Sequence, residues 1–94
     1  MTLTLNTILR INNTLIQKEH NGTIYIVDPT TETIHTLNET ASAIWRYLYK
    51  PRSIKNIIRL VTEEFDVGSE RAKEDVIKFL TDYFNKNLLN VVKK

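Results

Sequence analysis

Hydrophobic and polar positions alternate in the first half of the chain and recur at helical spacing in the second half. Residues 14–20, 23–28 and 33–37 are short runs with many β-branched, aromatic and other apolar side chains, which is typical of strands. The Asn-Gly pair at 21–22 favours a two-residue hairpin turn, because both residue types tolerate a positive φ. The Asp-Pro-Thr-Thr segment at 28–31 indicates a second turn. The pattern therefore predicts a three-stranded antiparallel meander.

Three helices are predicted after the meander. Each begins with a residue whose side-chain oxygen can accept an otherwise unpaired backbone N–H, and these N-cap residues are Asn38, Ser53 and Ser69. The first helix is predicted to run to about Tyr49 and to be ended by Pro51. Apolar residues recur at helical spacing at 41, 44, 45 and 48, at 54, 57, 58, 61 and 65, and at 72, 76, 79, 80 and 83.

The segments that flank these helices are shorter and less regular. Gly68 is suited to a left-handed conformation at the end of the second helix, and Asn87 to a cap at the end of the third. Leu88 and Leu89 are expected to fold back onto the core. Residues 1–11 alternate weakly and predict either a short arm or an extra edge strand. The expected fold is α+β and winged helix-turn-helix-like, with an N-terminal arm at 1–12 and a domain at 13–90.

Composition narrows the class of protein. A chain of 94 residues is one domain, and its net charge of +2 comes without the dense basic stripe of a strong nucleic-acid binder. There is no cysteine, which excludes disulfides and cysteine-based zinc sites. There is also no signal-peptide pattern and no apolar run near the roughly 18 residues that a membrane span needs. We therefore expect a cytoplasmic protein with no membrane partner.

Candidate catalytic groups are sparse. Two of the three serines are the expected N-caps, and the third, Ser42, lies within the first helix. The two histidines are His20, beside a turn, and His35, on the third strand. No His-x-x-x-His or Glu-x-x-His spacing and no glycine-rich phosphate loop is present. We therefore expect no catalytic activity, no metal and no cofactor.

Two segments carry a resemblance to a known family. Residues 37–45 read Leu-Asn-Glu-Thr-Ala-Ser-Ala-Ile-Trp, and residues 71–80 read Arg-Ala-Lys-Glu-Asp-Val-Ile-Lys-Phe-Leu. In this order they resemble the PqqD family of precursor-peptide recognition domains, over about residues 13–90. The resemblance implies that a leader peptide of a ribosomally made, modified peptide adds as an antiparallel strand beside the third strand, with side chains between that strand and the third helix.

The resemblance also implies a set of binding residues. On the third strand, Thr33 and His35 are expected to present their backbone groups at the free edge. On the third helix, Lys78 is expected to pair with a leader carboxylate, and Asp75 or Asp82 with a leader cation. Phe79 is expected either in the site or in the core, Phe84 is expected to be exposed, and Trp45 to be a core residue. The complete predicted peptide-binding set is Thr33, Ile34, His35, Thr36, Leu37, Asp75, Lys78, Phe79 and Asp82.

This chain departs from the family pattern at several positions. Family members often carry two aromatic residues on the third strand, where this chain has Ile34 and His35. They often carry Gly at the position of Ala41 and before the final Leu pair, where this chain has Asn87. Gly is also common in the turn before the third strand, where Thr31 and Glu32 stand here. The loss of the strand aromatics changes the shape of the pocket and hence the leader that fits it.

Several functions stay open at this point. The length and the N-terminal arm resemble the stand-alone leader-binding partners of lasso-peptide proteases, so the expected partners are a precursor leader peptide and a separate processing enzyme such as a leader peptidase. Similar stand-alone members serve radical enzymes as peptide chaperones. A winged-helix DNA-binding protein is a further alternative. The third helix mixes acidic side chains at 70, 74, 75 and 82 with basic ones at 71, 73 and 78, which would repel phosphates as much as attract them, so we expect no nucleic-acid partner. A structural subunit of a larger complex is the last alternative.

Overall fold

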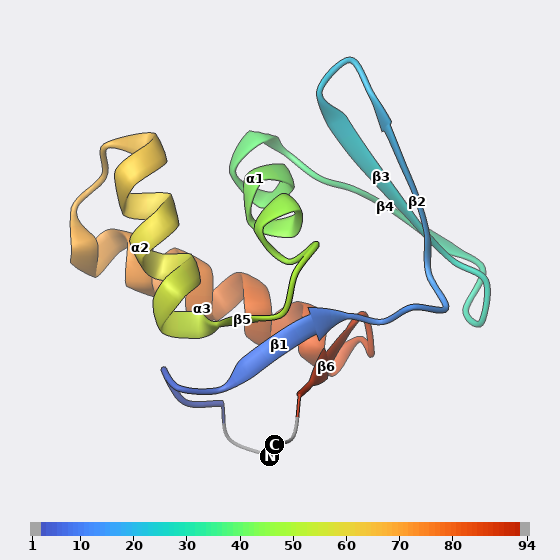
Figure 1. Cartoon of the computed structure of the whole chain (residues 1–94). Helices are drawn as coiled ribbons and strands as arrows, with labels where there is room; N and C mark the ends of the chain where they lie inside the picture. Colours follow the sequence, from blue (N-terminus) through green and yellow to red (C-terminus); the bar gives the residue numbers. More distant parts are fainter. Residues whose placement is uncertain (1–2, 93–94) are drawn as a thin grey trace.

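The computed structural model describes residues 3–92, which form two small antiparallel sheets and three helices (Figure 1). The first sheet is the predicted meander, in the order β2-β3-β4. Its strands are β2 (Ile16–His20), β3 (Thr23–Asp28) and β4 (Thr33–Thr36). The turn at Asn21 and Gly22 has φ values of 52° and 81°, as the Asn-Gly pair predicted. The second turn is held by Asp28, whose Oδ1 accepts the N–H of Thr30 at 3.0 Å.

The second sheet was not predicted. Its strands are β1 (Ile8–Ile11), β5 (Arg52–Ser53) and β6 (Leu89–Val91), in the order β5-β1-β6. Residues 8–11 are therefore a central strand rather than a short arm or an extra edge, and the side chain of Leu9 is fully buried. The predicted boundary between the arm at 1–12 and the domain at 13–90 separates β1 from β5 and β6, the strands with which it pairs.

The helices are α1 (Glu39–Tyr47), α2 (Ile54–Phe65) and α3 (Ser69–Asn85). Two predicted N-caps are confirmed. The side chain of Asn38 accepts the N–H of Ala41 at 2.8 Å, and that of Ser53 accepts the N–H of Asn56 at 3.1 Å. The first helix ends at Tyr47, two residues before the predicted end, because Leu48 already leaves the helical conformation at its C-cap.

The prediction for the α2–α3 connection was wrong in two respects. Ser69 is the first residue of α3, and the N-cap is Gly68, which has no side chain to accept a hydrogen bond. Gly68 has a φ of −60°, whereas the left-handed residue that ends α2 is Asp66, with a φ of 49°. Asp tolerates this conformation better than most residues, so glycine was not required for the turn.

The end of α3 confirms the predicted role of Asn87. Its φ is 64°, and its N–H donates to the carbonyl of Phe84 at 3.0 Å. The N–H of Leu88 donates to the carbonyl of Tyr83 at 3.0 Å, which completes a Schellman motif. Leu88 and Leu89 are both buried, as expected from the sequence. The motif therefore turns the chain back into β6.

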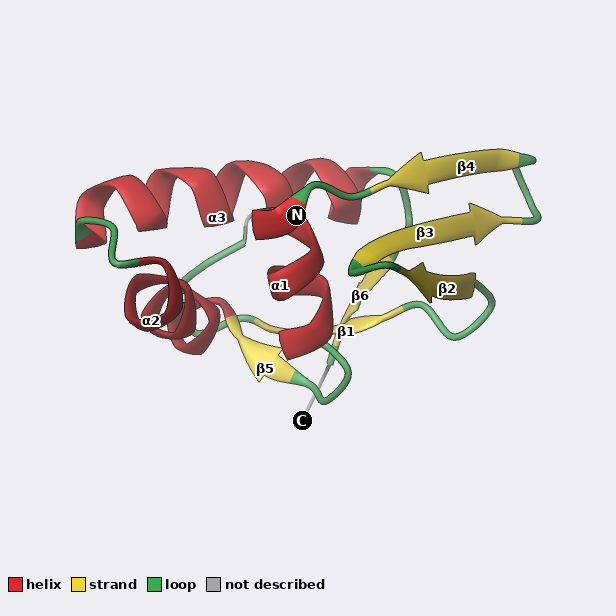
Figure 2. Ribbon diagram, turned by 90° about the horizontal axis from the view of Figure 1, so that it is seen from above, coloured by secondary structure: helices red, strands yellow, loops and turns green. Residues whose placement is uncertain are grey.

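The core packs residues of the meander against residues of the helices, and α1 lies beside the meander, next to the start of β3 (Figure 2). Trp45 is fully buried, which confirms it as a core residue, and its indole N–H donates to Gln17 Oε1 on β2 at 2.5 Å. Arg46 adds hydrogen bonds to Glu19 Oε1 and to the carbonyl of Gly22, each at 3.1 Å. Phe84, expected to be exposed, is partly buried against the core cluster. These contacts hold the meander in a fixed place relative to the helices.

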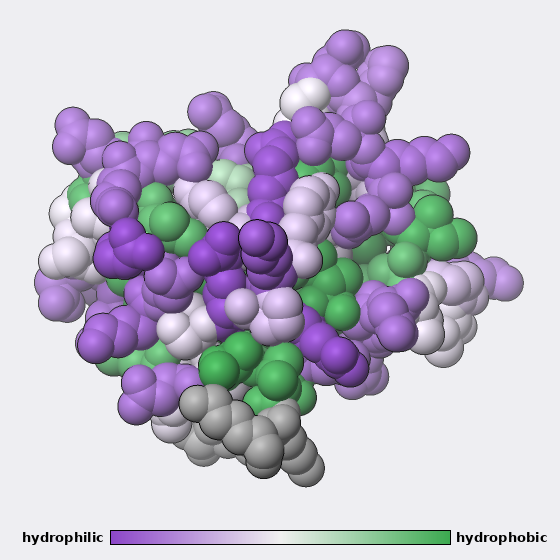
Figure 3. All heavy atoms as spheres, in the orientation of Figure 1, coloured by the Kyte–Doolittle hydropathy of each residue, from purple (hydrophilic) through white to green (hydrophobic). Residues whose placement is uncertain are grey.

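The outer face of the meander carries apolar side chains that no other part of residues 3–92 covers. Ile16, Val27 and Ile34 lie in one cross-strand row, because Ile16 pairs with Val27 and Val27 pairs with Ile34. Ile34 is 67% exposed and Ile16 is 51% exposed. The space-filling view shows a mostly hydrophilic face, with hydrophobic side chains surfacing on the side of the meander (Figure 3). Single exposed apolar residues are common, and a row of this kind is small.

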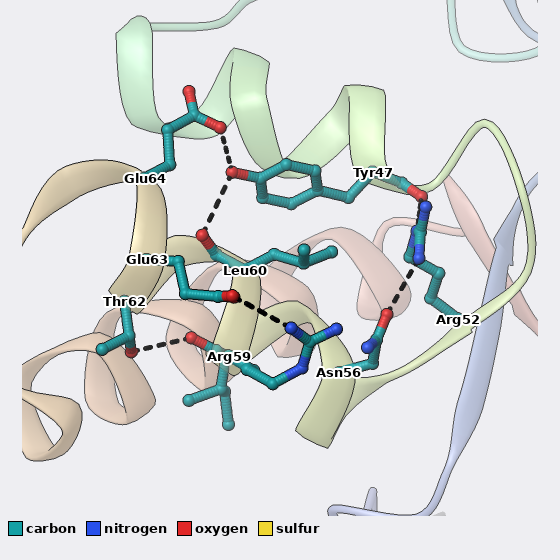
Figure 4. Close-up of polar contacts among 9 residues, drawn as sticks. Tyr47, Arg52, Asn56, Arg59, Leu60, Thr62, Glu63 and Glu64 are labelled. Atoms are coloured by element: carbon teal, nitrogen blue, oxygen red, sulfur yellow. Dashed lines mark hydrogen bonds and ion pairs between the residues drawn. The ribbon is translucent and has the colours of Figure 1, made fainter.

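A polar cluster joins α1 to α2 on the opposite side of the molecule (Figure 4). The hydroxyl of Tyr47 donates to a carboxylate oxygen of Glu64 and lies 3.4 Å from the carbonyl oxygen of Leu60. Arg52 donates to the carbonyl of Tyr47 at 2.5 Å and to Asn56 Oδ1 at 2.9 Å. Burial raises the pKa of the Tyr47 phenol, and the hydrogen bond and charge of Glu64 raise this pKa further. The neutral phenol is therefore the form that the folded state stabilises.

This cluster predicts that part of the protein's folding stability is lost at alkaline pH. Because the pKa of Tyr47 is higher in the folded state than its ordinary value of 10.0, the stabilisation is complete below pH 10 and is lost as the pH rises above it. We expect Tyr47→Phe to lower the free energy of unfolding by about 1 kcal/mol at pH 7. Denaturant unfolding at pH 7 to 11 measures the difference between the two proteins, which should narrow above pH 10. A constant difference across this range would contradict the assignment.

Candidate functional site

Strand β4 has one unpaired edge among the described residues. It pairs with β3 on one side, and the sheet ends there. The N–H of Leu37 donates to the carbonyl of Ile24 at 3.0 Å, one step beyond the pair of Tyr25 with Thr36 and in the same register. In an antiparallel ladder, hydrogen-bonded and non-hydrogen-bonded pairs alternate. The backbone groups of Thr33, His35 and Leu37 therefore point toward β3.

The same alternation turns the N–H and C=O groups of Ile34 and Thr36 outward. This reverses the expectation that Thr33 and His35 present their backbone at the free edge. The sequence could not settle this point, because the direction depends on the register with β3 rather than on β4 itself. β4 contains no proline or lysine, the residues with which natural edge strands often block pairing. Its outer edge is therefore open to another strand.

The side chains of β4 divide between two faces. Ile34 and Thr36 lie on the outer face of the meander, and both are exposed. Thr33, His35 and Leu37 lie on the inner face, where their partners Asp28, Ile26 and Ile24 are buried. Leu37 itself is 3% exposed, so it belongs to the core rather than to a surface. His35 is half-buried, and its ring centroid lies 5.9 Å from that of Tyr83 on α3.

A cluster of aromatic side chains from α3 and α1 lies behind His35. The ring centroids of Phe79 and Tyr83 are 4.2 Å apart, and those of Tyr83 and Trp45 are 6.2 Å apart. Phe79 and Tyr83 are both partly buried, so each has one side in the core and one side exposed. Burial raises the pKa of the Tyr83 phenol, and the Asp82 carboxylate adds to this. We call His35, Phe79 and Tyr83 the aromatic floor.

Two hollows flank the aromatic floor. The first, the strand-end hollow, is lined by Asp28, Thr31, Thr33, His35 and Lys86. The second, the helix-start hollow, is lined by Asn38, Thr40, Ala41, Ile44, Asp75 and Phe79. The strand-end hollow joins β4 to Lys86, the C-cap residue of α3, and the helix-start hollow joins the segment after β4 to two residues of α3. His35 lines the first hollow and Phe79 the second, so the aromatic floor lies between them, and we call the floor and the two hollows together the groove.

The structure brings most of the predicted site residues into this groove. Thr33, His35, Phe79 and Asp75 line it, and Ile34 and Thr36 supply its open edge. Lys78 and Asp82 line a hollow on α3 that shares Asp75 and Phe79 with the helix-start hollow, so they lie next to the groove. Asp75 lies 3.6 Å from Arg71, and Asp82 lies 3.1 Å from Lys86, in exposed pairs.

Eight residues of the groove are outside the predicted set: Asp28, Thr31, Asn38, Thr40, Ala41, Ile44, Tyr83 and Lys86. Tyr83 was assigned to the inner stripe of the third helix, although it stands one helical turn after Phe79 and so shares its side of the helix. Lys86, which pairs with Asp82 at 3.1 Å, belongs to none of the sequence patterns described above. Its position in the groove follows from the Schellman motif and the crossing of β4 over the end of α3, which no local pattern shows.

Within residues 3–92, no group of three or more His, Asp or Glu side chains is arranged to hold a metal ion. No helix in the described part of the chain is both long enough and apolar enough to cross a membrane.

The chain is similar to known proteins in sequence and in fold. Residues 24–89 match the family described as coenzyme PQQ synthesis protein D (PqqD). The chain belongs to the PqqD family. The match begins within β3 and ends in β6, so it spans β4, the three helices and every residue of the groove. No curated protein matches the chain in sequence.

Solved structures share the fold of this PqqD-family chain at low identity. TbiB1, in complex with the TbiA(beta) leader peptide, is 21% identical with a TM-score of 0.81, covering 90% of this chain and 99% of that chain. A lasso peptide synthetase B1 complexed with the leader peptide is 19% identical with a TM-score of 0.74, covering 90% and 98%. The PqqD truncation of Methylobacterium extorquens PqqCD is a stand-alone recognition element for ribosomally synthesised and post-translationally modified peptides (RiPPs). It is 13% identical with a TM-score of 0.76, covering 95% of each chain.

The direction of the backbone groups on β4 predicts an amide-exchange pattern. The N–H groups of Ile34 and Thr36 face solvent, whereas those of His35 and Leu37 are bonded to β3. We expect the first two to exchange at least about tenfold faster than the second two in the free protein. Native-state hydrogen exchange followed by NMR measures this difference. Protection of Ile34 and Thr36 with rapid exchange at His35 would contradict the register.

Proposed function

We propose that this chain binds the leader segment of a ribosomally made precursor peptide and delivers it to a separate processing enzyme, with a lasso-peptide protease as the favoured partner. The observation that carries the proposal is the open edge of β4 beside the groove. The N–H and C=O groups of Ile34 and Thr36 face outward, so an added antiparallel strand exchanges two hydrogen bonds with each residue.

Backbone pairing alone does not supply the affinity. Each hydrogen bond made in exchange for water contributes only about 0.5–1.5 kcal/mol, and ordering the peptide costs more than a few such bonds return. The groove supplies the remaining contacts, because every second side chain of the added strand enters it. Membership of the PqqD family supports this function, as do two similarly folded proteins that were solved with leader peptides.

The proposed mechanism is positional rather than chemical. The chain holds the leader while the attached core peptide reaches the active site of the processing enzyme. Such tethering raises the local concentration of substrate to about the millimolar range for a short flexible link. On this proposal the chain carries no catalytic group of its own and acts in the cytoplasm, where precursor peptides are made.

The test is fluorescence anisotropy with the labelled leader of the precursor peptide encoded beside the gene. We expect saturable binding with a Kd of about 1 μM or tighter, which corresponds to roughly −8 kcal/mol. Ile34→Pro removes an outward N–H without removing a bond to β3, and it should weaken binding at least about tenfold. Ile34→Ala keeps the N–H and should change Kd by no more than about threefold.

Circular dichroism confirms that each variant is folded. Absence of saturable binding by the wild-type protein at high concentration would rule out this leader as its ligand. Equal binding by the proline and alanine variants would rule out pairing at the β4 edge. Binding of duplex DNA with a steep salt dependence would instead favour the winged-helix alternative.

A further inference from the structure

Charged residues are unevenly distributed along this chain. The segments 1–18 and 40–62 contain no Asp or Glu. Their basic residues are Arg10, Lys18, Arg46, Lys50, Arg52, Lys55 and Arg59. Every acidic residue lies in the segments 19–39 and 63–82. Strands β1 and β5, the part of α1 after Glu39 and most of α2 therefore contribute positive charge only.

These two segments lie together in space. β1 pairs with β5, with Leu9 opposite Arg52. A hollow of about 520 Å³ lies between the segment that joins β1 to β2 and the loop that joins α1 to β5, and its lining includes Arg10, Tyr49 and Pro51. We call it the loop hollow, and it shares no lining residue with the groove. Figure 2 shows β5 and the loop before it on the side of the molecule opposite α3 and β4, so the loop hollow lies away from the groove.

Much of the surface in the loop hollow is apolar. Its apolar lining residues are Ile11, Leu15, Leu48, Tyr49 and Pro51. Two of its polar side chains are already used within the fold. The amide of Asn12 donates to the backbone that follows α3, and Gln17 accepts the indole N–H of Trp45. A ligand in the hollow therefore meets apolar surface beside the side chains of Arg10 and Asn13.

An exposed aromatic ring and unpaired basic side chains lie on this part of the molecule. Tyr49 is 53% exposed, although it follows the buried Leu48 directly. Arg10, Lys50 and Lys55 are exposed, and none of them forms an ion pair with a carboxylate of residues 3–92. Tyrosine and arginine are enriched in protein–protein interfaces, where they often contribute much of the binding energy. The combination is therefore typical of a protein-binding surface.

The charge of this region determines the chemistry of the partner. Positive charges that have no acidic neighbours in sequence attract an acidic surface and steer its approach, and they repel a basic one. A nucleic acid requires a continuous basic stripe that follows its phosphates. Here the basic side chains border an apolar hollow instead. A protein surface with Asp or Glu around an apolar side chain fits this arrangement.

We infer that the loop hollow, with Tyr49, Arg10 and Lys50, is the surface on which the processing enzyme docks. The enzyme contributes an apolar side chain to the hollow and carboxylates to the two basic side chains. Delivery of a leader requires that the chain hold the leader and the enzyme at the same time. The groove and the loop hollow share no residue, so binding at one leaves the other accessible. The inference rests on the proposed function and adds the second binding surface that delivery needs.

The experiment measures association of the full chain with the purified processing enzyme encoded beside the gene, by surface plasmon resonance with saturating leader. Tyr49→Ala should raise the dissociation rate about tenfold, whereas Tyr49→Phe keeps the ring and should stay within about twofold of wild type. Arg10→Glu and Lys50→Glu should each lower the association rate about fivefold at low ionic strength, and less at high salt because the charges are screened. Lys73→Glu on α3 is the matched control and should change neither rate by more than about twofold.

Leader binding by the same variants separates the two proposals. Circular dichroism checks that each variant is folded, and each should bind the labelled leader within about twofold of wild type, since none of the changed residues lines the groove. If the wild-type protein does not bind the leader, the proposed function fails. If it binds the leader but not the enzyme, or if Tyr49→Ala and Lys50→Glu associate with the enzyme like Lys73→Glu, only the docking inference fails.

Other occupants of the loop hollow give different results. Self-association of the chain in analytical ultracentrifugation that Tyr49→Ala abolishes, with enzyme association unchanged, would assign the surface to a second copy. Binding of duplex DNA that Lys50→Glu abolishes, with enzyme association unchanged, would assign it to a nucleic acid. Either result would overturn the inference.

Discussion

The hydrogen bond from the N–H of Leu37 to the carbonyl of Ile24 belongs to the register between β3 and β4, and this register sets which backbone groups of β4 face outward. Because backbone groups and side chains both alternate along a strand, this one bond decides that Ile34 and Thr36 offer their backbone to a partner and that His35 faces α3. A slip of one residue would exchange both properties together. It would bury Ile34 against Tyr83 and turn His35 to solvent. The open edge and the groove are therefore consequences of a single register.

The register is held by packing on the inner face of the meander. Leu37 is almost completely buried there beside Ile24 and Ile26, and a slip of β4 by one residue would turn it to the outer face. Trp45 reinforces the arrangement, since its ring is buried and its N–H is satisfied by Gln17 on β2. α1 thus anchors the meander from the side opposite the exposed row. An edge held in this way is organised before a peptide arrives, which lowers the entropy that binding must offset.

Local patterns predicted the parts of the fold that depend on neighbouring residues. The Asn-Gly turn, the caps at Asn38 and Ser53, and the left-handed Asn87 all follow from residues within a few positions of one another. The second sheet does not, because β5 has two residues and β6 has three, and neither carries a pattern of its own. The resemblance to the PqqD family predicted a site on the third strand and the third helix. It did not give the direction of the backbone groups or the place of Lys86, which depend on register and on helix packing.

The aromatic floor explains how this chain accommodates a strand that lacks the family's usual pair of aromatic residues. Ile34 faces outward and would not line the groove whatever its size, so only the position of His35 matters for the floor. There the ring of Tyr83 lies 5.9 Å from the imidazole and is backed by Phe79 and Trp45. The apolar surface of the groove is therefore supplied mainly by α3. On the proposed function, backbone pairing at β4 is indifferent to sequence, so discrimination between leaders falls to the side chains that line the groove.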